Sequence, residues 1–93
     1  MSNFARASAL LLLAWCCAAR GAPTNEWFDR ANQFYRTEQY DSAGAYYRKI
    51  IDAGVESPAV YYNLANTCFR RDKPGLAVLY LERAKRLAQI GRA

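Results

Sequence analysis

Apolar side chains recur along this chain with the spacing of an α-helix. Trp27, Ala31 and Phe34 are four and three residues apart, so they would form one stripe along a helix. The same spacing gives three further stripes: Ala43, Tyr47 and Ile50; Tyr61, Ala65 and Cys68; and Ala77, Leu81 and Ala84. The pattern predicts four helices at roughly 25–37, 41–53, 58–71 and 74–89, and therefore an all-α domain.

Residues that favour helix ends lie between these stripes. Gly54 suits a left-handed end for the second helix. Ser57 and Pro58 predict the N-cap and first residue of the third helix. The sequence DKPG at 72–75 predicts the turn that starts the fourth helix, again with an early proline.

The second half of this pattern repeats the first. Residues 25–56 align with 59–90, with these identical pairs: Ala31 and Ala65, Asn32 and Asn66, Arg36 and Arg70, Ala43 and Ala77, Tyr46 and Tyr80. A 34-residue period is typical of tetratricopeptide (TPR) repeats, which are helix–turn–helix units. The chain resembles two tandem TPR units, at 24–57 and 58–91, which implies a fragment of an α-solenoid.

The resemblance extends over the characteristic positions of both units. These are Trp27, Ala31, Tyr35, Tyr40, Ala43, Tyr47 and Ile50, then Tyr61, Leu64, Ala65, Phe69, Ala77, Leu81 and Ala84. The stretch YYNLANTCFRRDKPGLAVLYLERAKRL is also similar to the exported TPR proteins of bacterial Bat (aerotolerance operon) clusters. Two features depart from the family pattern. Val55 and Gln89 stand where a proline is usual, and LAQIGRA stands where a further repeat or capping helix is expected.

The resemblance also implies a peptide-binding groove, because the first helix of each TPR unit lines a concave surface. The groove residues would be Phe28, Asn32, Tyr35 and Arg36, then Tyr62, Asn66, Phe69 and Arg70. In one interpretation the asparagines bond a peptide backbone, the arginines pair with its carboxylates and the aromatic rings add contact area. In the other, the asparagines bond neighbouring helices and the arginines are solvated helix-end charges.

Asn63 raises a narrower hypothesis. Together with Asn32 it matches two asparagines of co-chaperone repeats that grip a C-terminal carboxylate. Phe28 stands where that clamp has a lysine, and the basic residues of its third repeat have no counterpart here. Asn63 is therefore predicted to be structural.

Residues 1–21 have the order of a secretory signal peptide: Arg6, the apolar run 7–19, then small residues. Cleavage is expected after Ala19 or Gly21. The run is shorter than the ~20 residues of a membrane-spanning helix. The alternatives are a retained short anchor and lipidation at Cys16 or Cys17. We expect an exported protein, periplasmic or membrane-associated, with secretion as the alternative.

Without this leader, Cys68 is the one cysteine left, so no intramolecular disulfide forms. It is predicted to be a small buried apolar residue, with oxidation or dimer crosslinking as the alternative. Loss of Arg6 and Arg20 lowers the formal net charge from +5 to +3. Residues 70–93 hold seven of the basic and two of the acidic side chains. They form either a solvated helix end or a surface attracted to anionic lipid or an acidic partner. Nucleic-acid binding is not expected of an exported protein.

The residues that catalysis most often uses are missing from the sequence. It has no histidine, no glycine-rich phosphate loop and no paired cysteines at metal-binding spacing. Asp41, Asp52, Glu56 and Asp72 are expected at helix ends as caps or turn residues. We therefore predict a protein that is not an enzyme, with no catalytic residue, cofactor or metal.

These patterns predict an exported TPR adaptor that binds a protein or peptide. By the Bat resemblance, the partners would be membrane proteins of the same gene cluster. The alternative is a structural module that self-associates or completes a longer solenoid. Its interface would be apolar residues that the last helix exposes: Leu76, Leu79, Tyr80, Leu87 and Ile90.

Overall fold

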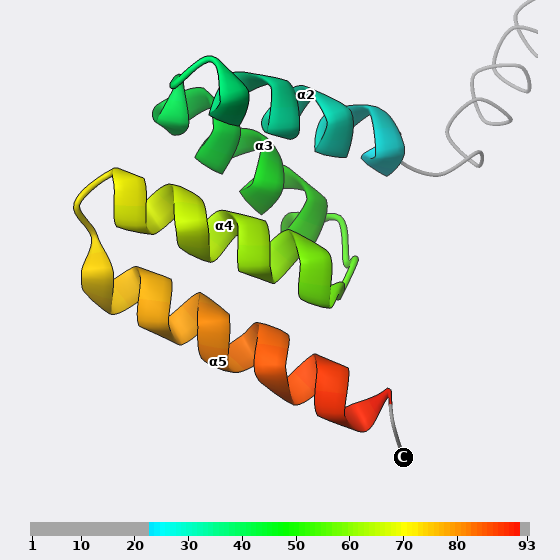
Figure 1. The fold of residues 1–93 in the computed structure, drawn as a ribbon. Helices are drawn as coiled ribbons and strands as arrows, with labels where there is room; N and C mark the ends of the chain where they lie inside the picture. Colours follow the sequence, from blue (N-terminus) through cyan, green and yellow to red (C-terminus); the bar gives the residue numbers. More distant parts are fainter. Residues whose placement is uncertain (1–22, 92–93) are drawn as a thin grey trace, which may run out of the picture.

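Four helices account for most of the structure, which is a computed structural model describing residues 23–91 (Figure 1). They are α2 (Thr24–Arg36), α3 (Tyr40–Asp52), α4 (Pro58–Arg70) and α5 (Pro74–Ile90). The prediction of an all-α fold is confirmed, and each predicted helix end lies within one residue of the observed one. The predicted signal peptide lies outside the described residues.

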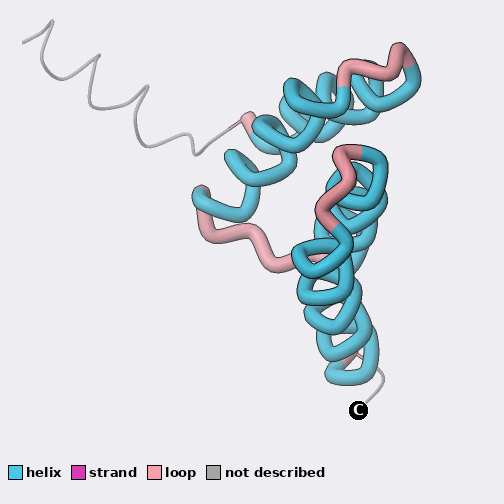
Figure 2. Tube along the Cα trace, turned by 90° about the vertical axis from the view of Figure 1, so that its left-hand side faces the viewer, coloured by secondary structure: helices cyan, strands magenta, loops and turns pink. Residues whose placement is uncertain are grey.

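The helices form two hairpins that repeat along the chain. Hairpin 1 comprises α2 and α3, and hairpin 2 comprises α4 and α5 (Figure 2). Their first helices begin at Thr24 and Pro58, and their second helices at Tyr40 and Pro74. The members of each pair occupy equivalent positions of the repeat, so the helix boundaries reproduce the offset found in the sequence. Each helix packs against the next one along the chain.

Each of the three connections between helices contains a residue in the left-handed region. Glu38, Gly54 and Asp72 have φ angles of 62°, 92° and 60°, in the left-handed region. The following amide bonds back to the last helical turn, as in Gln39 N–H to Phe34 O at 2.8 Å and Lys73 N–H to Cys68 O at 2.9 Å. These are Schellman motifs, which satisfy carbonyls that a helix end leaves free. Gly54 was predicted in this role, whereas Glu38 and Asp72 hold the conformation without glycine's freedom.

Opposite substitutions at this shared turn position should have opposite effects on stability. Glu38→Gly should raise the free energy of unfolding by about 0.5–1 kcal/mol. Glycine adopts a positive φ without the steric strain that the Glu38 side chain causes there. Gly54→Ala should lower it by about 1 kcal/mol. A methyl group at Gly54 would have no atom within 4 Å, so the loss would come from the backbone alone. Urea unfolding followed by circular dichroism measures both, and a shift of the same sign for the two variants would contradict the argument.

The core runs through all four helices and uses small residues where helices approach closely. Ala31 and Ala43 are fully buried, and Leu64 and Ala65 are 1% exposed. The other buried apolar residues are Tyr47, Ile50, Val60, Tyr61, Cys68, Ala77 and Ala84. The predicted stripes therefore face the interior, with Trp27 and Phe34 half-buried at the edge.

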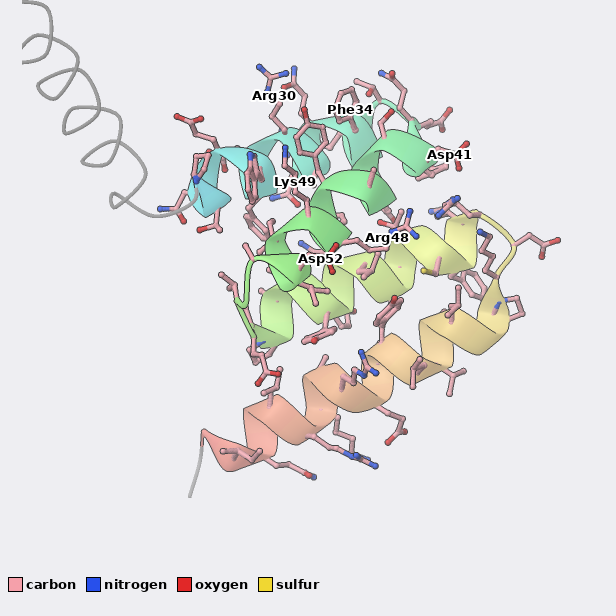
Figure 3. All side chains as sticks on the ribbon, turned by 180° about the vertical axis from the view of Figure 1, so that it is seen from behind. Arg30, Phe34, Asp41, Arg48, Lys49 and Asp52 are labelled. Carbon is pink, nitrogen blue, oxygen red and sulfur yellow. The ribbon has the colours of Figure 1, made fainter. Side chains whose placement is uncertain are left out.

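An aromatic cluster covers the outer side of hairpin 1. Phe34 stacks on Tyr46 with ring centroids 5.7 Å apart, and Lys49 Nζ lies 4.4 Å from the centroid of Trp27. Figure 3 shows Arg30, Phe34 and Lys49 on this side of the hairpin. The Lys49 stem and the rings cover part of one another's surface, so Trp27 and Phe34 are half-buried and not fully exposed.

Helix α5 departs from the predicted packing at one position. Leu81 was expected in the buried stripe with Ala77 and Ala84, but it is 41% exposed. No helix of the described residues lies beyond α5 to cover it. The predicted exposure of the last helix is observed at Leu76, Leu79 and Ile90, while Tyr80 and Leu87 are half-buried. Within residues 23–91, no helix combines the length and the hydropathy that crossing a bilayer requires.

Candidate functional site

Three polar side chains from three helices meet at the centre of the structure. Asn32 of α2 accepts a hydrogen bond from the Tyr47 hydroxyl of α3. Asn63 Nδ2 of α4 donates to the same Asn32 oxygen at 3.3 Å. Asn63 also accepts, through its main-chain carbonyl, a hydrogen bond of 2.8 Å from Thr67 Oγ1. The Asn32 oxygen thus joins both hairpins.

Burial fixes the protonation state of this cluster. The Tyr47 side chain is 1% exposed. Desolvation raises the pKa of Tyr47 to about 12, although its hydrogen bonding with Asn63 acts in the opposite direction. The hydroxyl therefore stays protonated beyond the pH at which an exposed tyrosine ionises, and it remains the donor to Asn32.

A cavity of about 220 Å³ opens beside the cluster; we call it the central cavity. Side chains of α2, α3 and α4 surround it. Its lining residues are Asn32, Tyr35, Arg36, Tyr47, Asn63 and Asn66. The volume is below the roughly 300–1,000 Å³ of sites for drug-sized ligands, so it suits one side chain or a short stretch of backbone.

The donors that line the central cavity are asparagine amides, one guanidinium and two tyrosine hydroxyls. Asn66 is half-buried, and no side-chain hydrogen bond is formed by it within residues 23–91. Across that part of the chain, every buried side-chain nitrogen or oxygen has a partner. The Asn66 amide is therefore open to the cavity, where it and the exposed Arg36 can meet a carbonyl or a carboxylate.

Four of the eight predicted groove residues line the central cavity, and four do not. Asn32, Tyr35, Arg36 and Asn66 are brought together there. Phe28, Tyr62, Phe69 and Arg70 lie elsewhere. The eight positions therefore do not form one continuous lining.

Each of the other four residues has a different environment. Phe28 packs edge-on against Tyr47, with centroids 6.1 Å apart. Tyr62 lines a separate groove between α4 and α5, and Phe69 is 69% exposed. Arg70 is exposed and lines a different hollow, together with Glu38 and Tyr40.

Two lining residues were not among the predicted groove positions. Asn63 was predicted to be structural, and its bond to Asn32 has that character. Tyr47 was predicted as a packing residue, and only its hydroxyl was overlooked. A buried tyrosine normally needs a partner for its hydroxyl, so that group could have pointed to a nearby asparagine.

Cys68 behaves as predicted. It is 3% exposed and is a free thiol in the described part of the chain. Desolvation raises the pKa of the Cys68 thiol, with Arg71 acting in the opposite direction. Little thiolate forms at neutral pH, which disfavours oxidation and crosslinking.

The ion pair at the start of α3 ties the two hairpins together at their turns. Arg71 Nε lies 2.7 Å from Asp41 Oδ1. The Asp41 side chain is 89% exposed, so the pair contributes at most about 1 kcal/mol. Its role is to hold the end of α4 beside α3.

Comparisons with known proteins give no match. No protein-family model, curated protein or solved structure is significantly similar to the chain. Within residues 23–91 there is also no group of three His, Cys, Asp or Glu side chains that could hold a metal ion.

Proposed function

We propose that the chain is a TPR adaptor that binds a peptide segment of another protein in the central cavity. The 34-residue spacing of both pairs of helix starts supports the TPR assignment. The observation that carries the function is the open amide of Asn66 beside Arg36, between the first helices of the two hairpins. An extended peptide would place a carbonyl on Asn66 and an acidic side chain on Arg36.

The two asparagines at equivalent repeat positions have different roles in this proposal. Asn32 uses its oxygen to join the hairpins. At Asn66 the corresponding partner is missing, because Leu81 is the repeat equivalent of Tyr47 and has no hydroxyl. Asn66 is therefore the residue that recognises the peptide, and Asn32 holds the cavity in shape.

The proposal includes export of the chain from the cytoplasm. The order of residues in the leader supports a periplasmic or membrane-associated adaptor without enzymatic activity. The similarity of residues 61–87 to Bat-cluster proteins supports membrane proteins of its own gene cluster as partners.

Asn66→Ala should weaken peptide binding about five- to tenfold while leaving helicity unchanged, because it removes a hydrogen bond from an open amide. Arg36→Ala should act similarly on acidic peptides. The partner is first captured on the mature chain from membrane extracts, and its binding segment is then titrated by calorimetry. Gln33→Ala and Arg30→Ala are matched controls, since both side chains are exposed on the same helix as Arg36 and outside the cavity. Equal affinities for all four variants would rule the proposal out.

A second candidate function is structural. Leu76, Leu79 and Ile90 of α5 are 43–71% exposed, and their spacing places them on one side of the helix. This surface would be the interface through which the chain enters a larger assembly. Analytical ultracentrifugation of the mature chain tests it against the adaptor function, which requires no assembly.

A further inference from the structure

One side of α5 carries large apolar and basic side chains that are open to solvent. Its residues follow one another at three- and four-residue spacing, which places them in one row along the helix. In order they are Leu76, Leu79, Arg83, Arg86 and Ile90. The three apolar residues are 43–71% exposed, and both arginines are exposed. The row is about 21 Å long, and we call it the outer row.

Hairpin 1 shows that neighbouring helices leave this side of the second helix uncovered. On α3 the repeat equivalents of Leu79, Arg83 and Arg86 are Ala45, Lys49 and Asp52. All three are exposed, although α2 and α4 both pack against α3 (Figure 3). The corresponding row on α3 is therefore a solvent-facing surface of a helix that has neighbours on both sides.

The residues of α3 that α4 covers belong to a different row. Gly44 and Tyr47 are buried, and a methyl group on Gly44 would lie 3.6 Å from Thr67 Cγ2 of α4. Their repeat equivalents on α5 are Val78 and Leu81, which are not in the outer row. A helix packed on α5 as α4 packs on α3 would therefore leave the outer row exposed, whether it came from this chain or from another.

The outer row differs from its counterpart on α3 in composition. On α3 the equivalent positions are small or polar, and their charges, on Lys49 and Asp52, are balanced. On α5 two leucines and an isoleucine accompany two arginines, and the row contains no acidic residue. Exposed large apolar side chains interleaved with cations are typical of a helix that lies on an anionic lipid surface.

The two arginines carry positive charge that no neighbour neutralises. Arg83 and Arg86 line a hollow of about 430 Å³, in which Glu56 is the one acidic residue. Neither arginine forms an ion pair within residues 23–91. Arg83 Cζ lies 5.9 Å from the ring centroids of Tyr61 and Tyr80, so these rings help to position its guanidinium. The hollow therefore has an excess of cations that can bind an anionic group.

The positions of the arginines favour a lipid surface over a protein. They lie between Leu79 and Ile90, so a two-fold pairing of outer rows from two copies would bring four guanidinium groups together. An acidic protein would need carboxylates at fixed points among its apolar contacts. A bilayer has no such requirement, because its phosphates are mobile and cover an apolar layer. Leucine and isoleucine side chains reach that layer while arginine stems extend back to the headgroups.

We propose that the outer row binds the surface of an anionic lipid bilayer, with α5 lying in the plane of the headgroups. Its apolar side chains enter the acyl boundary, and Arg83 and Arg86 bind phosphates. No residue of α5 lines the central cavity, so the proposal does not depend on peptide binding there. It assigns to lipid the side of α5 that the structural function would assign to a protein assembly.

Vesicle flotation with residues 22–93 tests the proposal. This segment contains all four helices, and it lacks the apolar run 7–19, which could insert by itself. Vesicles of phosphatidylglycerol and phosphatidylcholine in equal amounts should bind it at least about tenfold more tightly than phosphatidylcholine alone, and salt should weaken the binding. Soluble glycerol phosphate at the same phosphate concentration should not displace it, because it offers no apolar layer.

Variants of neighbouring residues locate the contact. Arg86→Gln should weaken binding to the anionic vesicles about fivefold, the contribution of one cation near such a surface. Lys85→Gln is the matched control, because it removes the same charge from a residue that lines the groove between α4 and α5. Its effect should stay below about twofold.

The apolar part of the contact has its own pair of variants. Leu79→Gln should weaken binding about tenfold, because it removes a side chain that enters the acyl boundary. Val78→Gln is the control, since Val78 is 59% exposed but lies outside the outer row. Circular dichroism should show equal helicity for all four variants.

Several outcomes would overturn the proposal. These are absence of vesicle binding, equal binding to neutral and anionic vesicles, and equal losses within either pair of variants. Displacement by glycerol phosphate would assign the arginines to a soluble anion. A dimer that Leu79→Gln dissociates, without vesicle binding, would assign the row to a second copy. Asn66→Ala should keep full vesicle binding, so failure of the peptide proposal and failure of this one are distinguishable.

Discussion

Leu64→Ala is expected to lower the free energy of unfolding by about 3 kcal/mol, from the lost apolar contacts and the cavity left behind. Leu64 is 1% exposed and lies on α4, which packs against both α3 and α5. Its truncation therefore loosens both interfaces of the central helix. For a domain of this size the total stability is roughly 4–10 kcal/mol, so a large part would be lost.

Urea unfolding followed by circular dichroism measures the effect. Leu76→Ala is the matched control, because Leu76 is 43% exposed on α5 and its truncation should change stability by no more than about 0.5 kcal/mol. If both variants lose the same amount, or Leu64→Ala loses less than about 1 kcal/mol, α4 is not the centre of the packing.

The helices were predictable because their determinants are local. Stripes at four- and three-residue spacing define the buried faces, and Gly54, Pro58 and Pro74 mark helix ends. The exposure of Leu81 could not be predicted in the same way. Periodicity shows which face of a helix is apolar, but it does not show whether a neighbour covers that face. The repeat aligned Leu81 with Tyr47, yet among the helices of residues 23–91 only Tyr47 has a neighbour beyond it.

The candidate site was half predictable for a related reason. The repeat grouped Asn32 and Asn66 on one side of the first helices, and both line the central cavity. It could not separate their roles, because these depend on contacts across 15 and 31 residues, with Tyr47 and Asn63. Equivalent sequence positions at the two ends of an array meet different neighbours. For the same reason the pattern could not show that Tyr62 and Phe69 lie outside this cavity.

Stability should fall at alkaline pH because of Tyr47. Desolvation raises its pKa to about 12 in the folded chain, from an ordinary value of 10.0. Between these values the unfolded chain has released the Tyr47 proton while the folded chain still holds it, so rising pH favours unfolding. The contribution is fully present below about pH 10, decreases by about 1.4 kcal/mol per pH unit, and is lost by about pH 12, for a total of about 2–3 kcal/mol.

Tyr47→Phe separates this effect from the titration of other groups. At neutral pH it should cost about 1–2 kcal/mol, because Asn32 loses the hydroxyl donor. Above pH 10 its stability should fall less steeply than that of the wild type, so the two curves converge. Urea unfolding at a series of pH values gives both curves, and phenolate absorbance reports the tyrosine that ionises last. Tyr62→Phe, at a ring that is 54% exposed, should keep the wild-type slope. A Tyr47→Phe curve parallel to the wild type up to pH 12 would show that the buried hydroxyl does not couple ionisation to folding.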